Sequence, residues 1–169
     1  MKTHTDPVEV IFTDDDQDDL DFFREALLQV ERTTHLNTFR DCEGLMKYLN
    51  RKKSPPSPDI LFLDINMPKM DGLTCLHKIR EDQKYRKLPI IMFTTSLRPL
   101  DVEQSYRWGA NLYIKKPSGQ GELVITLKRL FSKQWFDRLI NHEKQHITYP
   151  VQGYGSSTTS YNPILSEDF

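Results

Sequence analysis

Four short apolar runs along the chain each end at a polar residue. They are Val8–Phe12 before Thr13, Ile60–Leu63 before Asp64, Ile90–Phe93 before Thr94, and Leu112–Ile114 before Lys115 and Lys116. Short apolar runs with polar boundaries are typical of buried strands. A weaker, more polar run at Leu36–Arg40 fits a strand at the edge of a sheet. The pattern therefore predicts five strands.

The segments between these strands carry apolar residues at helical spacing. We expect helices over Asp18 to about Val30, Glu43 to about Arg51, Gly72–Gln83, Pro99 to about Trp108, and from near Gly121 onward. The last segment keeps an i, i+4 stripe well past the usual length of a domain helix. This stripe consists of Leu123, Leu127, Phe131, Trp135 and Leu139, and it predicts one extended final helix.

Strands that alternate with helices predict an α/β fold, a doubly wound five-stranded parallel sheet with five helices. In such sheets the ligand site lies outside the carboxyl ends of the strands, where the winding reverses. The polar residues that follow the apolar runs should therefore meet at one edge of the sheet.

Composition narrows the class of protein. The 169 residues suffice for one domain with an appendage, and 37% hydrophobic residues can form a proper core. A net charge of −1 argues against a DNA partner, which usually requires a basic excess. No apolar stretch approaches the roughly 20 residues that span a membrane, and the start lacks the apolar core of a signal peptide. We therefore expect a cytoplasmic protein.

Two cysteines, Cys42 and Cys75, fall in predicted helices without the spacing of metal ligands. Buried thiols are expected at such positions in preference to a disulfide or a zinc site.

The polar residues at the predicted edge suit phosphoryl transfer to a carboxylate. Such a reaction needs oxygen ligands for Mg²⁺, an ionised carboxylate as nucleophile, and a cation with hydrogen-bond donors for the phosphoryl oxygens. Asp14 and Asp15 suit the metal, Asp64 the nucleophile, and Thr94 and Lys116 the oxygens. Simpler interpretations exist, because an acidic cluster also complements the dipole of a helix amino terminus.

Four motifs follow the predicted strands in order. They are Ile11-Phe12-Thr13-Asp14-Asp15-Asp16, Leu63-Asp64-Ile65-Asn66-Met67-Pro68-Lys69-Met70-Asp71-Gly72, Met92-Phe93-Thr94-Thr95-Ser96 and Tyr113-Ile114-Lys115-Lys116-Pro117. Together they resemble the receiver domain of two-component response regulators, over residues 8 to about 135. Thr94-Thr95-Ser96 and Trp135 are most similar to the small stand-alone receivers paired with phytochrome-type histidine kinases.

The resemblance implies a flavodoxin-like strand order, 2-1-3-4-5, and a role for each site residue. Asp64 would be the phosphoacceptor. Asp15 would bind Mg²⁺ directly and Asp14 through water, with Asp64 and the main-chain carbonyl of Asn66 as further ligands.

The phosphoryl group itself would be held by Thr94 and Lys116. Tyr113 occupies the switch position, whose ring turns inward as Thr94 moves. Pro117 would follow a cis bond that aims the lysine.

The resemblance also implies a regulatory phosphoacceptor and not an enzyme, with a sensor histidine kinase or phosphotransfer protein as partner. Output would come from partner binding or from a homodimer through the fourth helix, fifth strand and fifth helix. We expect an amino-terminal arm over 1–7, the receiver domain over 8–136, and a partly helical, then flexible, extension over 137–169.

Two departures from the family pattern leave alternatives open. Asp16 makes the acidic group a triplet, so the metal pair could be Asp15 and Asp16. Thr95 stands where the family usually has a small Ala or Gly, which implies narrower access to Asp64 and an altered phosphoryl lifetime. A docking module that keeps the fold but no longer switches is a further alternative. A haloacid-dehalogenase-like Mg²⁺-dependent phosphatase is the alternative function, with Asp14 as its nucleophile.

Overall fold

The computed structural model describes residues 6–51 and 57–140, which form one parallel sheet covered by helices on both faces. The strands are β1 (Val8–Thr13), β2 (Thr34–Phe39), β3 (Ile60–Leu63), β4 (Ile90–Thr94) and β5 (Leu112–Lys115), in the order β2-β1-β3-β4-β5. All four strand pairs are parallel. The predicted fold and strand order are confirmed, including the polar strand at the edge.

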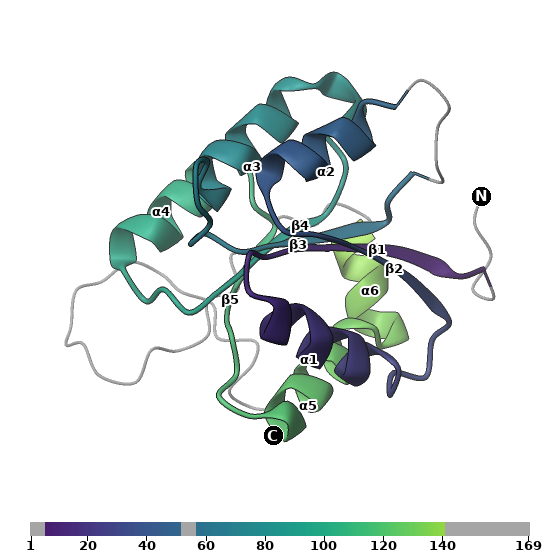
Figure 1. Cartoon of the computed structure of the whole chain (residues 1–169). Coiled ribbons are helices and arrows are strands. Elements are labelled where there is room, and N and C mark those ends of the chain that lie inside the picture. Colours follow the sequence, from purple (N-terminus) through teal and green to yellow (C-terminus); the bar gives the residue numbers. More distant parts are fainter. Residues whose placement is uncertain (1–5, 52–56, 141–169) are drawn as a thin grey trace, which may run out of the picture.

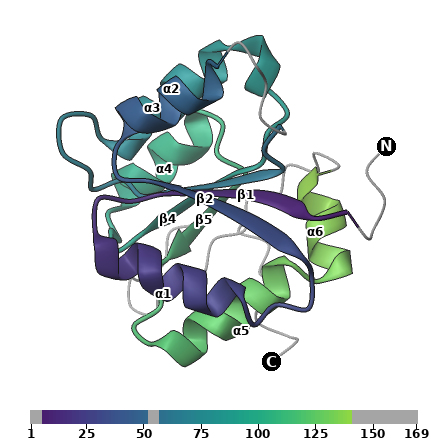
Figure 2. The ribbon, with the colours of Figure 1, turned by 45° about the vertical axis from the view of Figure 1, so that its right-hand side comes forward.

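The helices divide between the two faces of the sheet (Figure 1). One face carries α2 (Cys42–Leu49), α3 (Gly72–Glu81) and α4 (Pro99–Arg107), and the other carries α1 (Gln17–Leu27), α5 (Gln120–Leu130) and α6 (Lys133–Ile140). A short 3-10 turn, η1 (Gln83–Tyr85), follows α3. Figure 2 shows the same layers from a second direction, with α1 beside α5. None of the helices within residues 6–51 and 57–140 has the length and apolar character to cross a membrane.

Each face of the sheet has its own hydrophobic core, because successive side chains of a strand point to opposite faces. Phe12 and Phe62 pack toward α1 and α5, where Phe23 and Phe93 join them in edge-to-face and tilted contacts. The core on the other face includes Ile11, Leu61, Met92 and Tyr113. The central strands are thus buried on both sides, as their continuous apolar runs predict.

Three helices begin with an aspartate cap just beyond the carboxyl edge of the sheet. The side chains of Asp16, Asp41 and Asp71 accept hydrogen bonds from the backbone N–H of Asp18, Gly44 and Thr74. Such caps satisfy N–H groups that have no partner within the helix. They fix where α1, α2 and α3 start, and with them the loops that surround the site.

The predicted extended final helix is wrong, because two helices replace it. α5 ends at Leu130, and Phe131 and Ser132 separate it from α6. A straight helix of 20 residues would run about 30 Å, whereas strands of four to six residues span only about 13–20 Å. The break lets Phe136 and Leu139 return to the core beside α1 and α5, where the rings of Phe131 and Phe136 stack.

The two cysteines are not free thiols as predicted. Cys42 of α2 and Cys75 of α3 form a disulfide with an S–S distance of 2.13 Å. The helices lie side by side on one face of the sheet, which brings the two Cα atoms within 5.9 Å of each other. This proximity depends on helix packing across 33 residues of sequence, so the spacing of the cysteines alone could not show it.

Candidate functional site

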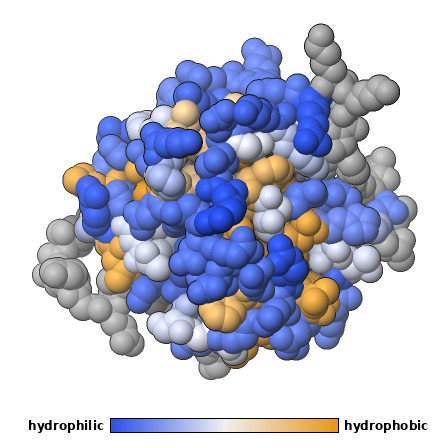
Figure 3. All heavy atoms as spheres, in the orientation of Figure 1, coloured by the Kyte–Doolittle hydropathy of each residue, from blue (hydrophilic) through white to orange (hydrophobic). Residues whose placement is uncertain are grey.

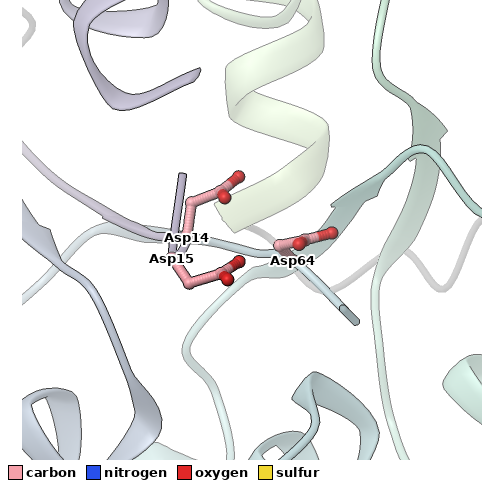
Figure 4. A group of neighbouring side chains, drawn as sticks. All are labelled: Asp14, Asp15 and Asp64. Atoms are coloured by element: carbon pink, nitrogen blue, oxygen red, sulfur yellow. The ribbon is translucent and has the colours of Figure 1, made fainter. Parts of the chain in front are cut away.

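The carboxyl ends of β1 and β3 bring three carboxylates together. Thr13 pairs with Leu63 across the two strands, and the backbone N–H of Asp64 donates to the Thr13 carbonyl at 3.0 Å. Asp14 and Asp15 follow β1 directly, so they lie beside Asp64. One carboxylate oxygen from each of the three residues lies within 4.8 Å of the others, and Figure 4 shows the three side chains close to one another.

Lys116, just after β5, supplies positive charge to this cluster. Its Nζ lies 2.6 Å from Asp14 Oδ2 and 3.8 Å from Asp64 Oδ2. Burial of the ammonium group lowers the pKa of Lys116, but its contacts with Asp14 and Asp19 outweigh this effect and the pKa is raised. The lysine is therefore charged at neutral pH.

Asp14 is fully buried, and burial raises its pKa to about 6, although Lys116 opposes the shift. Asp64 is only 3% exposed, and its Oδ1 has no hydrogen-bond donor within the described part of the chain. A buried carboxylate oxygen without a donor is unfavourable unless a cation or ligand satisfies it. Three convergent carboxylates with such an oxygen fit a divalent cation that prefers oxygen ligands.

The end of β4 forms the other wall of the site. Thr94 is fully buried, and its Oγ1 accepts a hydrogen bond from the backbone N–H of Ser96 at 3.3 Å. Tyr113 donates from its hydroxyl to the Ser96 carbonyl at 3.0 Å, and burial raises its pKa to about 12. The ring of Tyr113 is thus already turned inward, and Ser96 links it to Thr94.

Comparison with known proteins places this site in a family. The pattern of the response regulator receiver domain matches residues 10–128. The chain belongs to the response regulator receiver family. It is thus the receiver unit of a two-component response regulator, and this membership lends no support to the phosphatase alternative.

The receiver is similar to regulators of the phytochrome type, as predicted from its motifs. Response regulator Rcp1 of Synechocystis sp. (strain ATCC 27184 / PCC 6803 / Kazusa) is 29% identical over 120 residues, which are 69% of this chain and 82% of Rcp1. The phosphorylated cyanobacterial phytochrome response regulator RcpA matches with a TM-score of 0.68 at 27% identity, over 74% of this chain and 91% of RcpA. The Mn²⁺-bound form of Rcp1 gives a TM-score of 0.69 at 26% identity, over 76% and 95%.

Some curated relatives are much longer than the receiver. The sensor histidine kinase CheAY of Helicobacter pylori (strain ATCC 700392 / 26695) is 32% identical over 120 residues, which are only 14% of its length. The similarity therefore covers only a small part of CheAY.

The remaining predicted residues lie around the rim of the site. The side chain of Asn66 is exposed, and its Nδ2 donates to Thr95 Oγ1 at 3.5 Å. The carboxylate of Asp16 caps α1 and does not join the cluster of Asp14, Asp15 and Asp64. The expected cis bond before Pro117 is absent, since every described peptide bond is trans. Trans is the intrinsically favoured form.

Sequence reasoning missed two residues at the site. Asp19, in the first turn of α1, accepts a hydrogen bond from Lys116 Nζ at 2.6 Å, although the two residues are 97 positions apart. Gly72, at the start of α3, packs directly against the backbone of Asp64. The acidic run that contains Asp19 and the Asp71-Gly72 pair were visible in the sequence, but their contacts were not.

Proposed function

We propose that this receiver is a phosphorylation-dependent switch that accepts a phosphoryl group on Asp64. The observation that supports the proposal most is the unsatisfied, buried Oδ1 of Asp64 beside two carboxylates and a charged lysine. An ionised carboxylate in this position can attack phosphorus, and the surrounding groups can neutralise the charge that the phosphoryl oxygens bring.

The donor would be a phosphohistidine of a sensor histidine kinase or phosphotransfer protein. One oxygen of the Asp64 carboxylate forms the new O–P bond while the P–N bond of the donor breaks. The imidazole leaves with the electron pair of that bond and takes a proton from solvent. The protein then carries an acyl phosphate and turns over no other substrate, so its role is regulatory.

Mg²⁺ is the cation that we assign to the carboxylates, with Asp14, Asp15, Asp64 and the main-chain carbonyl of Asn66 as the residues that hold it. When bound, it offsets the negative charge of the phosphoryl oxygens. Asp14 and Asp15, and not Asp16, form the acidic pair in this proposal, because the Asp16 carboxylate caps α1.

Thr94 and Lys116 would bind the phosphoryl oxygens, and Tyr113 would report the change. The Oγ1 of Thr94 accepts a hydrogen bond from the backbone N–H of Ser96, so movement of Thr94 toward a phosphoryl group would act on Ser96. The hydroxyl of Tyr113 donates a hydrogen bond to the carbonyl of Ser96. Movement of Thr94 would therefore act on the position of Tyr113 through Ser96.

The surface that carries the output is proposed to be the α4–β5–α5 face, through binding of a partner or of a second copy of this chain. The molecular face in Figure 3 is mostly hydrophilic, with small apolar patches. The large exposed apolar side chains of this face within the described residues are Leu97 just before α4, Leu100 in its first turn and Ile125 on α5. They are the apolar contacts that this face offers a partner, and Phe22 and Leu28 are comparably exposed at α1. Residues 8–136 stay our prediction for the receiver unit, and the extension beyond 140 lies outside the described residues.

Labelling by acetyl phosphate tests the proposal. The wild type should incorporate phosphate only with Mg²⁺, and Asp64→Asn should abolish incorporation. Asp16→Asn is the matched control, because it removes a carboxylate two residues from Asp14 that lies outside the cluster. Steady release of phosphate that survives Asp64→Asn would instead favour a phosphatase, and absence of labelling in the wild type would favour a docking module that does not switch.

A further inference from the structure

Lys116 donates a hydrogen bond to a carboxylate of α1 and not to Asp64. Its Nζ lies 2.6 Å from Asp19 Oδ2 and donates to it, whereas Asp64 Oδ2 is 3.8 Å away, beyond hydrogen-bonding distance. The lysine side chain is 10% exposed and that of Asp19 is 35% exposed. Three carboxylates, those of Asp14, Asp19 and Asp64, thus surround one ammonium group.

The orientation of α1 explains why Asp19 takes part and its neighbour does not. Asp16 caps the helix, and the apolar side of α1 is formed by Leu20, Phe23, Ala26 and Leu27. Asp19 lies four residues before Phe23, so it flanks the buried side and faces the end of β5. Asp18 is exposed to solvent. The two adjacent carboxylates therefore have different environments on the same helix.

We propose that Asp19 is a positioning residue that holds Lys116 in the unphosphorylated state and competes with the phosphoryl group for it. This inference rests on the proposed function of Asp64. To pair with a phosphoryl oxygen on Asp64, the ammonium of Lys116 must either move away from Asp19 or bind both groups at once. Either way, the carboxylate of Asp19 stabilises the resting state relative to the phosphorylated one.

Charge leads to the same conclusion as geometry. A phosphoryl group adds negative charge to a cluster that already holds several carboxylates, and each neighbouring carboxylate opposes this addition. Removal of the Asp19 charge should therefore strengthen the binding of a phosphoryl mimic. A merely structural role predicts the opposite, because loss of an ion pair between α1 and the end of β5 would loosen the site.

Binding of beryllofluoride at saturating Mg²⁺, followed by ¹⁹F NMR, measures this competition without turnover. We expect Asp19→Asn to bind the mimic more tightly by roughly two- to fivefold, the range for an exposed ion pair. Asp19→Glu, which keeps the carboxylate, should stay close to the wild type. Asp18→Asn removes the same charge one position away and should change the affinity by less than about twofold.

A double-mutant cycle isolates the contribution of the lysine. In a Lys116→Met background, Asp19→Asn should lose most of its effect on beryllofluoride affinity and keep only the small gain that removal of a nearby negative charge brings. Unchanged or weaker binding by Asp19→Asn in the native background would overturn the inference, as would a gain of undiminished size without Lys116. If the wild type with Mg²⁺ binds no beryllofluoride at all, the proposed function itself fails, and that outcome is distinct from a wild type that binds without any effect of Asp19.

Discussion

Gly72 packs so closely against Asp64 that a side chain cannot fit between them. A Cβ built on Gly72 would lie 1.9 Å from the carbonyl oxygen of Asp64 and 2.9 Å from the Cα of Ile65. The backbone N–H of Gly72 also donates to the Ile65 carbonyl at 2.9 Å. The start of α3 is therefore in direct contact with the backbone of Asp64, the proposed phosphoacceptor.

Substitution of Gly72 by alanine should destabilise the protein severely. The atoms that a Cβ would meet are backbone atoms, which cannot rotate away, so the loop from β3 to α3 must shift. We expect a loss of about 3 kcal/mol or more in the free energy of unfolding, measured by urea denaturation.

Gly121→Ala is the matched control for this prediction. Gly121 lies in α5, and a Cβ there would meet no atom within 4 Å. Alanine is the better helix former, so this variant should gain up to about 1 kcal/mol. Equal stabilities for the two variants would contradict the close packing of Gly72 on Asp64.

The disulfide between Cys42 and Cys75 should contribute measurably to stability. It closes a loop across 33 residues, for which the chain-entropy relation gives about 3 to 4 kcal/mol. A reducing agent should lower the free energy of unfolding of the wild type by this amount and leave the Cys42→Ser/Cys75→Ser double variant unchanged. Two thiols that react with an alkylating agent in the unreduced, denatured protein would show that the bond is absent.

The buried carboxylate of Asp14 should make the metal-free protein less stable as the pH rises. Its pKa is about 6 in the folded state and 3.8 as the ordinary value, so the folded state holds the proton more tightly. This contribution to stability is fully present below about pH 4 and is lost as the pH rises to about 6, a change of about 3 kcal/mol.

Asp14→Asn removes this titration, so its stability relative to the wild type should increase between pH 4 and pH 7 in the presence of a chelator. Urea denaturation at several pH values measures the difference, with Asp18→Asn as the exposed control. Saturating Mg²⁺ should recover stability in the wild type, because a ligand that binds only the folded state stabilises it. A pH-independent difference would contradict the buried, protonatable state of Asp14.

The fold and the centre of the site could be predicted from the sequence because both depend on strong local patterns. Uninterrupted apolar runs identify buried strands, and parallel strands bring the residues after their carboxyl ends to one edge of the sheet. This is why Asp14, Asp15 and Asp64 could be expected together before any contact was known. The polar character of β2 likewise predicted its place at the edge of the sheet.

The features that were missed depend on how helices pack. The contact of Asp19 with Lys116 depends on the rotation of α1, and the disulfide depends on the placement of α2 beside α3. The apolar residues also keep helical spacing across the break between α5 and α6, so the spacing alone does not reveal the break. Because of the break, Phe136 is buried. The continuous stripe instead predicted that Trp135 would face the core, but Trp135 is only partly buried.

Location of the phosphoryl group on the protein tests the central claim most directly. After phosphorylation by acetyl phosphate with Mg²⁺, borohydride reduction converts a phosphorylated aspartate to homoserine, and peptide mass spectrometry locates the altered residue. We predict homoserine at position 64 and at no other aspartate. Homoserine at position 14 or 15, or an unaltered Asp64 in a protein that has taken up phosphate, would contradict the account.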